Sequence, residues 1–165
     1  MAFASSADGR RIYFEHHAGA GLPVLLIHGW GTSCRVWDTT LSALRSAGHA
    51  VVAFDQRGCG LSDKDFAENT ISLGAEDALA VLRQAGIDRA AVNGWSLGGA
   101  IATETASRLG TRCAGLVLTA AATPRYVQAP DYPHGNPPGG PTATVDVLRQ
   151  DRANFFDGLT KAVCA

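Results

Sequence analysis

Short apolar segments alternate with amphipathic ones along this chain, and the alternation constrains its fold more than any other feature. Segment 23–29 is an almost unbroken apolar run, typical of a strand buried on both faces of a parallel sheet. Segment 36–48 carries apolar residues at helical spacing and ends on Gly48, a common helix stop. The expected strands are 11–17, 23–29, 50–55, 89–94 and 114–121, and the expected helices are 36–48, 71–85 and 98–110. This order predicts an α/β fold with a mostly parallel sheet and helices on both faces.

The amino-acid composition changes after the last expected strand. Six of the 7 prolines lie within residues 123–141. Residues 142–163 then form a helical, amphipathic segment. We therefore expect two domains: residues 1–122 form the core, and residues 123–165 form a Pro-rich link and the beginning of a helical cap.

Composition narrows the function classes. The chain has 165 residues, 46% of them hydrophobic, and a formal net charge of −1. No basic stripe favours nucleic acid, and no apolar run is long enough to span a membrane, so neither partner is expected. The first residues show no signal-peptide pattern, which predicts a cytoplasmic protein. The cysteines lie too far apart for a typical zinc motif and are expected to be reduced thiols, namely Cys34, Cys59, Cys113 and Cys164.

Three loops that follow expected strands contain the motifs that suggest a ligand-binding or catalytic site. The sequence HGWG occupies residues 28–31, DQRGCGLSD occupies residues 55–63, and GWSLG occupies residues 94–98. In an open parallel sheet, ligands bind beyond the carboxyl ends of the strands. These three loops are expected to meet at that edge.

The G-x-S-x-G pattern predicts a nucleophile elbow. Gly94 and Gly98 lack the Cβ atoms that would collide in a sharp strand-to-helix turn, so Ser96 would be exposed at its apex. The backbone N–H groups of Leu97 and Trp30 would then form an oxyanion hole. The same five-residue pattern also occurs at ordinary helix starts, and the two upstream motifs make the elbow the better interpretation.

Other polar and aromatic residues near these loops have structural interpretations. His28 precedes the serine and is expected to organise its loop rather than to act as a base. Asp55 and Arg57 are expected to pair locally, and Trp95 to pack or to form a pocket wall. Three further histidines are expected to be exposed, namely His16, His17 and His49.

The order HGWG, D-x-R-G-x-G-x-S-D and G-x-S-x-G-G resembles the α/β-hydrolase superfamily over about residues 10–120. The segments AGLVLTAAATPRYVQAPDYPHG and DRANFF look like those of bacterial arylesterases, also called cofactor-free haloperoxidases or perhydrolases. HGWG together with GWSLGG is also similar to pimeloyl-carrier methyl ester esterases, which rank second.

The resemblance implies hydrolysis of a small-molecule ester through an acyl-enzyme on Ser96, without a metal or organic cofactor. In the arylesterase group, hydrogen peroxide can replace water and yield a peracid. The resemblance also implies that Trp30, Tyr126 and Phe155 line the substrate pocket, although Phe155 fits ordinary cap packing equally well.

A catalytic acid and histidine are not found in this chain. The superfamily order is Ser, then Asp or Glu, then His, and His134 is the only histidine after Ser96. It lies in the Pro-rich link, three residues after Asp131, and an Asp131–His134 relay would depart from the family. We therefore expect the N-terminal part of a longer hydrolase, weakly active or inactive by itself.

Strand 114–121 is apolar on both faces, and no strand follows it in this chain. Its bare edge predicts poor solubility or a homo-oligomer. The alternative to an esterase is a non-catalytic hydrolase-fold module that binds a small molecule or a partner.

Overall fold

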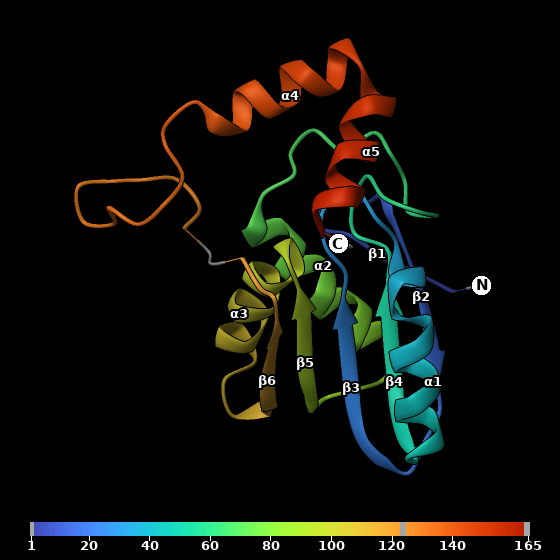
Figure 1. Ribbon diagram of the computed structural model, residues 1–165. Coiled ribbons are helices and arrows are strands. Elements are labelled where there is room, and N and C mark those ends of the chain that lie inside the picture. The colour runs from blue at the N-terminus through green and yellow to red at the C-terminus, as the bar shows by residue number, and fades with distance from the viewer. Residues whose placement is uncertain (1, 123–124, 164–165) are drawn as a thin grey trace. The chain divides into compact units, whose positions relative to one another are not determined.

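A computed structural model describes residues 2–122 and 125–163. The chain forms two compact units, Met1–Pro124 and Arg125–Ala165. The first unit is built around a six-stranded sheet with the strand order β1-β2-β4-β3-β5-β6 (Figure 1). Its strands are β1 (Ala2–Ser5), β2 (Arg11–His17), β3 (Gly21–Ile27), β4 (His49–Phe54), β5 (Ala90–Trp95) and β6 (Cys113–Thr119).

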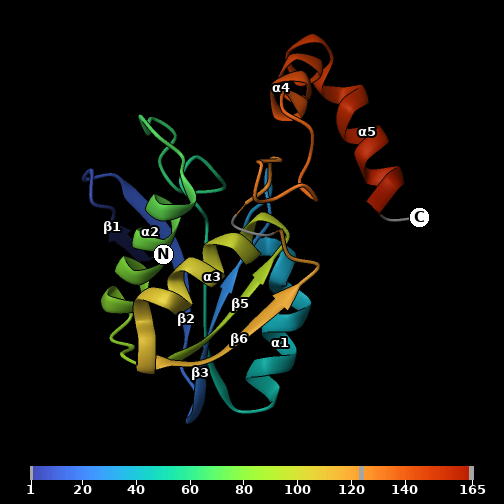
Figure 2. The same ribbon diagram turned by 90° about the vertical axis from the view of Figure 1, so that its left-hand side faces the viewer.

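The sheet is mostly parallel, as the sequence predicts. β3 pairs in parallel with both β4 and β5, and β5 pairs in parallel with β6. Figure 2 shows β3, β5 and β6 running in the same direction. β2 is the expected strand 11–17, but it runs antiparallel to β4 and to β1. The sequence does not predict β1, because four residues are too few to show a strand's alternation.

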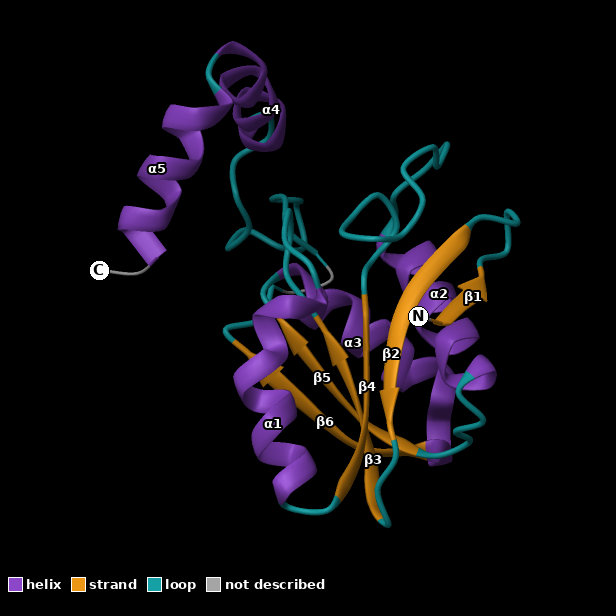
Figure 3. Cartoon of the chain, turned by 90° about the vertical axis from the view of Figure 1, so that its right-hand side faces the viewer, coloured by secondary structure: helices purple, strands orange, loops and turns teal. Residues whose placement is uncertain are grey.

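Helices cover both faces of this sheet (Figure 3). The 3-10 helix η1 (Cys34–Trp37) and α1 (Asp38–Ser46) lie on one face, and α2 (Ile71–Gln84) and α3 (Leu97–Leu109) lie on the other. Successive side chains of β4 point to opposite faces of the sheet and so contribute to a hydrophobic core on each face. Val51 packs with Trp37 and Leu41 on the α1 face. Val52 and Phe54 belong to the core on the face covered by α2 and α3. Where the sequence predicts one helix over 36–48, the structure has η1 followed directly by α1.

The second unit is helical after an irregular stretch. It contains α4 (Gly140–Gln150) and α5 (Arg152–Val163), where the sequence shows one long amphipathic segment. Asp151 interrupts the helix with φ −150° and ψ 86°, and its Oδ1 accepts a hydrogen bond from the Asn154 N–H at 3.0 Å. The expected boundary between residues 122 and 123 falls beside residues 123 and 124, which lie outside the described residues, so it stays a prediction.

β6 forms an outer edge of the sheet, next to β5. Its side chains Leu116, Val117 and Leu118 are all exposed. Among the described residues, no helix has both the length and the apolar character that a bilayer crossing requires.

Candidate active site

Ser96 sits at a strained turn between β5 and α3. Its backbone has φ 53° and ψ −124°, a region that residues with a Cβ atom rarely adopt. Three hydrogen bonds hold this conformation: the Ser96 N–H donates to the Thr119 carbonyl (3.2 Å), and the Ser96 carbonyl accepts from Gly99 (2.9 Å) and Ala122 (2.8 Å). The neighbouring strand end and the first turn of α3 therefore fix the position of the serine.

The two glycines of the G-x-S-x-G pattern are required by close backbone contacts. A Cβ atom on Gly94 would lie 2.2 Å from the Gly98 carbonyl oxygen. A Cβ atom on Gly98 would lie 2.3 Å from the Ile27 carbonyl oxygen and 2.4 Å from that of His28. The start of α3 thus packs directly on the end of β3.

The loop after β3 reaches the serine through Gly29. A Cβ atom on Gly29 would lie 3.0 Å from the Trp95 ring and 3.1 Å from the Ser96 Cβ. Trp30, the next residue, is exposed, and Leu97 is half-buried at the first position of α3. The fold therefore brings the segment that carries Trp30 beside Ser96 and Leu97, while their role as oxyanion donors stays a prediction.

His28 is fully buried, and both of its ring nitrogens are engaged. Nε2 accepts the Gln56 backbone N–H at 3.0 Å, and Nδ1 lies 2.7 Å from the Gly29 carbonyl, to which it donates. The Gln56 side-chain amide also donates to the His28 carbonyl. Burial lowers the pKa of His28, so the neutral ring is favoured. As expected, this histidine organises loops.

The expected local pair of Asp55 and Arg57 is wrong. The Asp55 carboxylate accepts the backbone N–H groups of Cys34 and Leu61, both at 2.7 Å. Arg57 instead binds Asp77 of α2 through two hydrogen bonds. Asp55 and Arg57 do not pair because the Asp55 carboxylate binds the backbone of two loops, whereas the Arg57 side chain extends to a helix.

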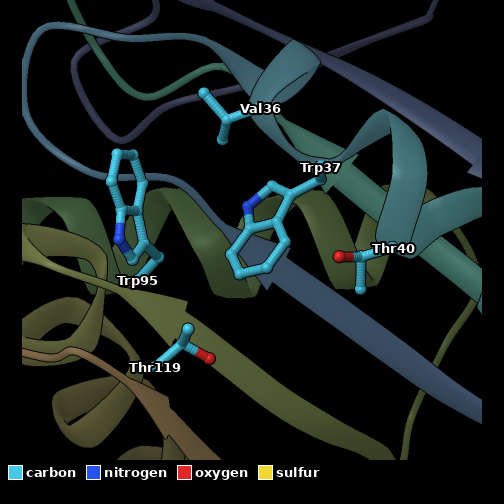
Figure 4. Close-up of a pocket in the computed structure, with 5 residues that line it drawn as sticks. All are labelled: Val36, Trp37, Thr40, Trp95 and Thr119. Atoms are coloured by element: carbon cyan, nitrogen blue, oxygen red, sulfur yellow. The ribbon is translucent and has the colours of Figure 1, made fainter. Parts of the chain in front are cut away.

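Trp95 lines a pocket on the α1 face of the sheet (Figure 4). The pocket has a volume of about 320 Å³, and its lining residues are Val36, Trp37, Thr40, Trp95 and Thr119. The sequence predicts that Trp95 either packs or forms a pocket wall, and the structure shows it in a pocket wall.

The remaining histidines of the first unit lie far from the serine in the strand register. His49 begins β4 and His17 pairs with Val51, so both lie at the amino ends of the parallel strands, whereas Ser96 follows a carboxyl end. His16 is exposed as expected, but His17 and His49 are half-buried, and His17 contacts Glu15 at 3.4 Å.

In the second unit, Asp131 has a different partner from the one a relay would need. Its carboxylate accepts two hydrogen bonds from Arg125, at 2.7 and 2.8 Å. Within the described part of the chain, no hydrogen bond joins Asp131 to His134. Tyr126 is exposed, and Phe155 contacts Phe156 edge to face with ring centroids 5.5 Å apart, so their pocket roles stay predictions.

The described cysteines Cys34, Cys59 and Cys113 are free thiols, and Cys164 lies outside the described residues. Across residues 2–122 and 125–163, no group of three or more His, Cys, Asp or Glu side chains is arranged to hold a metal ion.

Sequence reasoning missed two residues that support the site. Gln56 fixes the His28 ring, and Asp77 anchors Arg57. A signal for Asp77 existed, because this acid lies one helical turn before Val81, an apolar position, where an unpaired carboxylate would be costly.

Comparisons with known proteins support the fold. A family model described as alpha/beta hydrolase fold matches residues 23–162 and confirms the resemblance. A non-heme chloroperoxidase of Streptomyces lividans is 31% identical over 94% of this chain and 57% of its own length. A pimeloyl-[acyl-carrier protein] methyl ester esterase of Vibrio parahaemolyticus is 35% identical over 66% of this chain and 40% of its own.

A solved structure shows the same fold. An esterase from Exiguobacterium antarcticum superposes with a TM-score of 0.87 at 29% identity, covering 96% of this chain and 59% of its own. The chain spans about half the length of the curated relatives it matches.

Proposed function

The chain belongs to the α/β-hydrolase fold family, and we propose that it is a serine-dependent carboxylic ester hydrolase with Ser96 as the nucleophile. The observation that carries the proposal is the strained backbone of Ser96, with φ 53° and ψ −124°, at the amino end of α3. Strain of this kind costs about 1–3 kcal/mol and persists where the surrounding structure enforces it, often at reactive sites. An ordinary helix start would not require it.

The reaction would proceed through an acyl-enzyme. The Ser96 Oγ attacks the ester carbonyl carbon while a base takes its proton, and the carbonyl oxygen becomes an oxyanion. The N–H groups of Trp30 and Leu97 would stabilise that oxyanion, and each such donor contributes about 3 kcal/mol. The intermediate expels the alcohol, which receives the proton, and water then releases the acid. Hydrogen peroxide in place of water would release a peracid.

Among the described residues of the first unit, no histidine is placed to take the Ser96 proton. His28 is buried and fully hydrogen-bonded, and the other histidines there lie toward the opposite strand ends. We therefore propose that Ser96 is correctly placed but weakly activated in the 165-residue chain. External imidazole would replace the missing base, since it can take the serine proton and return it to the leaving alcohol.

Incubation with p-nitrophenyl acetate, with and without imidazole, tests this proposal. We expect slow hydrolysis that imidazole accelerates, and peptide mass spectrometry should find one acetyl group on the peptide containing Ser96. Ser96→Ala should lose both signals once the reaction of imidazole alone is subtracted. Ser107→Ala, an exposed position on the same helix, should keep both. Equal acetylation and rates in Ser96→Ala would exclude the nucleophile, and fast hydrolysis without imidazole would exclude the missing base.

The substrate class has two candidates. The arylesterase and perhydrolase assignment is supported by the coverage of the chloroperoxidase relative, which extends over 94% of this chain. The methyl ester esterase assignment is supported by higher identity over a shorter span. Assay of phenyl acetate beside dimethyl pimelate, with imidazole present, separates them, and preference for phenyl acetate is expected.

A further inference from the structure

We propose that the pocket between Trp37 and Trp95 binds a small aromatic molecule that carries a hydrogen-bond acceptor, such as a ketone or ester carbonyl. Ser96 does not line this pocket, although Trp95 precedes it in the chain and the Thr119 carbonyl accepts its backbone N–H. Its walls come from η1 and α1 on one side and from the ends of β5 and β6 on the other (Figure 4). The inference does not depend on the proposed function.

The polar requirement comes from Trp37. Only 6% of this residue is exposed, and its Nε1 is the one buried side-chain nitrogen or oxygen in the described residues that lacks a hydrogen-bond partner. Figure 4 shows the edge of the ring that carries this nitrogen turned toward Val36 and Trp95, which line the same pocket. A buried N–H without an acceptor is unfavourable, so an occupant that supplies one would be stabilised.

The apolar requirement comes from the two indole rings and Val36. A volume of about 320 Å³ lies at the lower end of the range for small-molecule sites, which favours a molecule with a single ring. The described lining residues include no Lys, Arg, Asp or Glu, so a neutral molecule fits better than an ion. Thr119 already donates its hydroxyl to Asn93 at 3.0 Å, whereas the buried Trp37 N–H lacks an acceptor.

The test uses acetophenone as the probe, with ethylbenzene as a molecule of similar shape that has no acceptor. The three tryptophans give three indole N–H signals in an NMR spectrum, and single Trp→Phe variants assign them. We expect acetophenone to shift the signals of Trp37 and Trp95 in a saturable way. Trp37→Phe keeps an aromatic wall but removes the donor, and should weaken acetophenone binding about tenfold while leaving the weaker ethylbenzene binding unchanged.

Matched variants locate the site. Val145→Phe adds a ring at an exposed valine that does not line the pocket, and acetophenone affinity should not change. Val36→Phe fills the pocket from an exposed position and should abolish binding even if Trp37→Phe fails to fold. Equal affinities for acetophenone and ethylbenzene, or unchanged binding in Val36→Phe, would overturn the proposal. A Trp37 signal that shifts with protein concentration alone would overturn it in favour of a second copy of the chain as the occupant.

Discussion

Arg57 and Asp77 form a buried ion pair that ties the loop after β4 to α2. Arg57 Nε and Nη2 donate to the two carboxylate oxygens at 2.7 and 2.9 Å, and the side chains are 4% and 1% exposed. The guanidinium also donates to the Glu68 carbonyl and stacks over Phe66, 4.7 Å from the ring centroid. The pair therefore holds a long polar loop against the helix that supports the sheet.

Removing one member of this pair should strongly destabilise the first unit. Asp77→Asn would leave the buried Arg57 charge with Asp8, 3.9 Å away and partly exposed, as its remaining ion-pair partner in the described residues, at a cost toward the lower end of about 3–5 kcal/mol in the free energy of unfolding. Urea unfolding followed by tryptophan fluorescence measures it. Asp88→Asn removes an acid from an exposed pair with Arg112 and should have little effect. Similar losses in both variants would show that the buried pair is not a major stabilising contact.

The elbow glycines give a second stability prediction. Gly98→Ala places a Cβ atom 2.3 Å from a backbone carbonyl oxygen, and the backbone must shift to accept it. We expect a loss of at least about 2 kcal/mol in the free energy of unfolding. Gly115→Ala on β6 meets no atom within 4 Å and serves as the control. If Gly98→Ala were as stable as Gly115→Ala, the tight packing of α3 on β3 would be wrong.

Glu15 gives a pH prediction. The Arg35 guanidinium, with smaller contributions from Tyr13 and His17, lowers the pKa of Glu15 to about 2 from a reference value of 4.5. Because the folded pKa is the lower one, ionised Glu15 stabilises the fold above about pH 4.5, and this stabilisation is lost as pH falls toward 2. The stability advantage of the natural protein over Glu15→Gln should thus be smaller at pH 3 than at pH 6. Urea unfolding at each pH tests it, and an advantage that grows in acid would contradict the assignment.

Thiol reactivity should separate the buried from the accessible cysteines. Burial raises the pKa of Cys34 to about 12, so the reactive thiolate is almost absent at neutral pH. N-ethylmaleimide at pH 7.5 should alkylate Cys113, which is half-buried, well before Cys34. Peptide mapping over time measures both rates, and denaturant should remove the difference. Equal rates in the native protein would mean that the loop holding Cys34 opens readily.

The exposed edge of β6 predicts self-association. Val117→Lys places a charge on that edge and should reduce association, because charged side chains discourage pairing between edge strands. Val147→Lys on α4 is a matched control, since the two valines are 50% and 49% exposed. Sedimentation analysis measures the change. A monomeric natural chain, or the same effect from both variants, would rule out β6 as the contact.

The sequence by itself determined the local features of this protein. The apolar run 23–29 and the stripe within 71–85 predicted β3 and α2 to within two residues, because burial on a sheet or helix face leaves a periodic pattern. The spacing of Gly94, Ser96 and Gly98 predicted a tight turn, since such a turn excludes Cβ atoms whatever the rest of the chain does.

Only the tertiary structure decided how distant residues pair. No pattern within one segment tells that β2 runs antiparallel to β4, or that Arg57 selects Asp77, 20 residues away, over the nearby Asp55. The sequence also does not show that Trp37 Nε1 lacks a hydrogen-bond partner, because this depends on every atom around the nitrogen. Periodicity reports whether a side chain is buried, whereas its partner is chosen by packing among segments that are far apart in sequence.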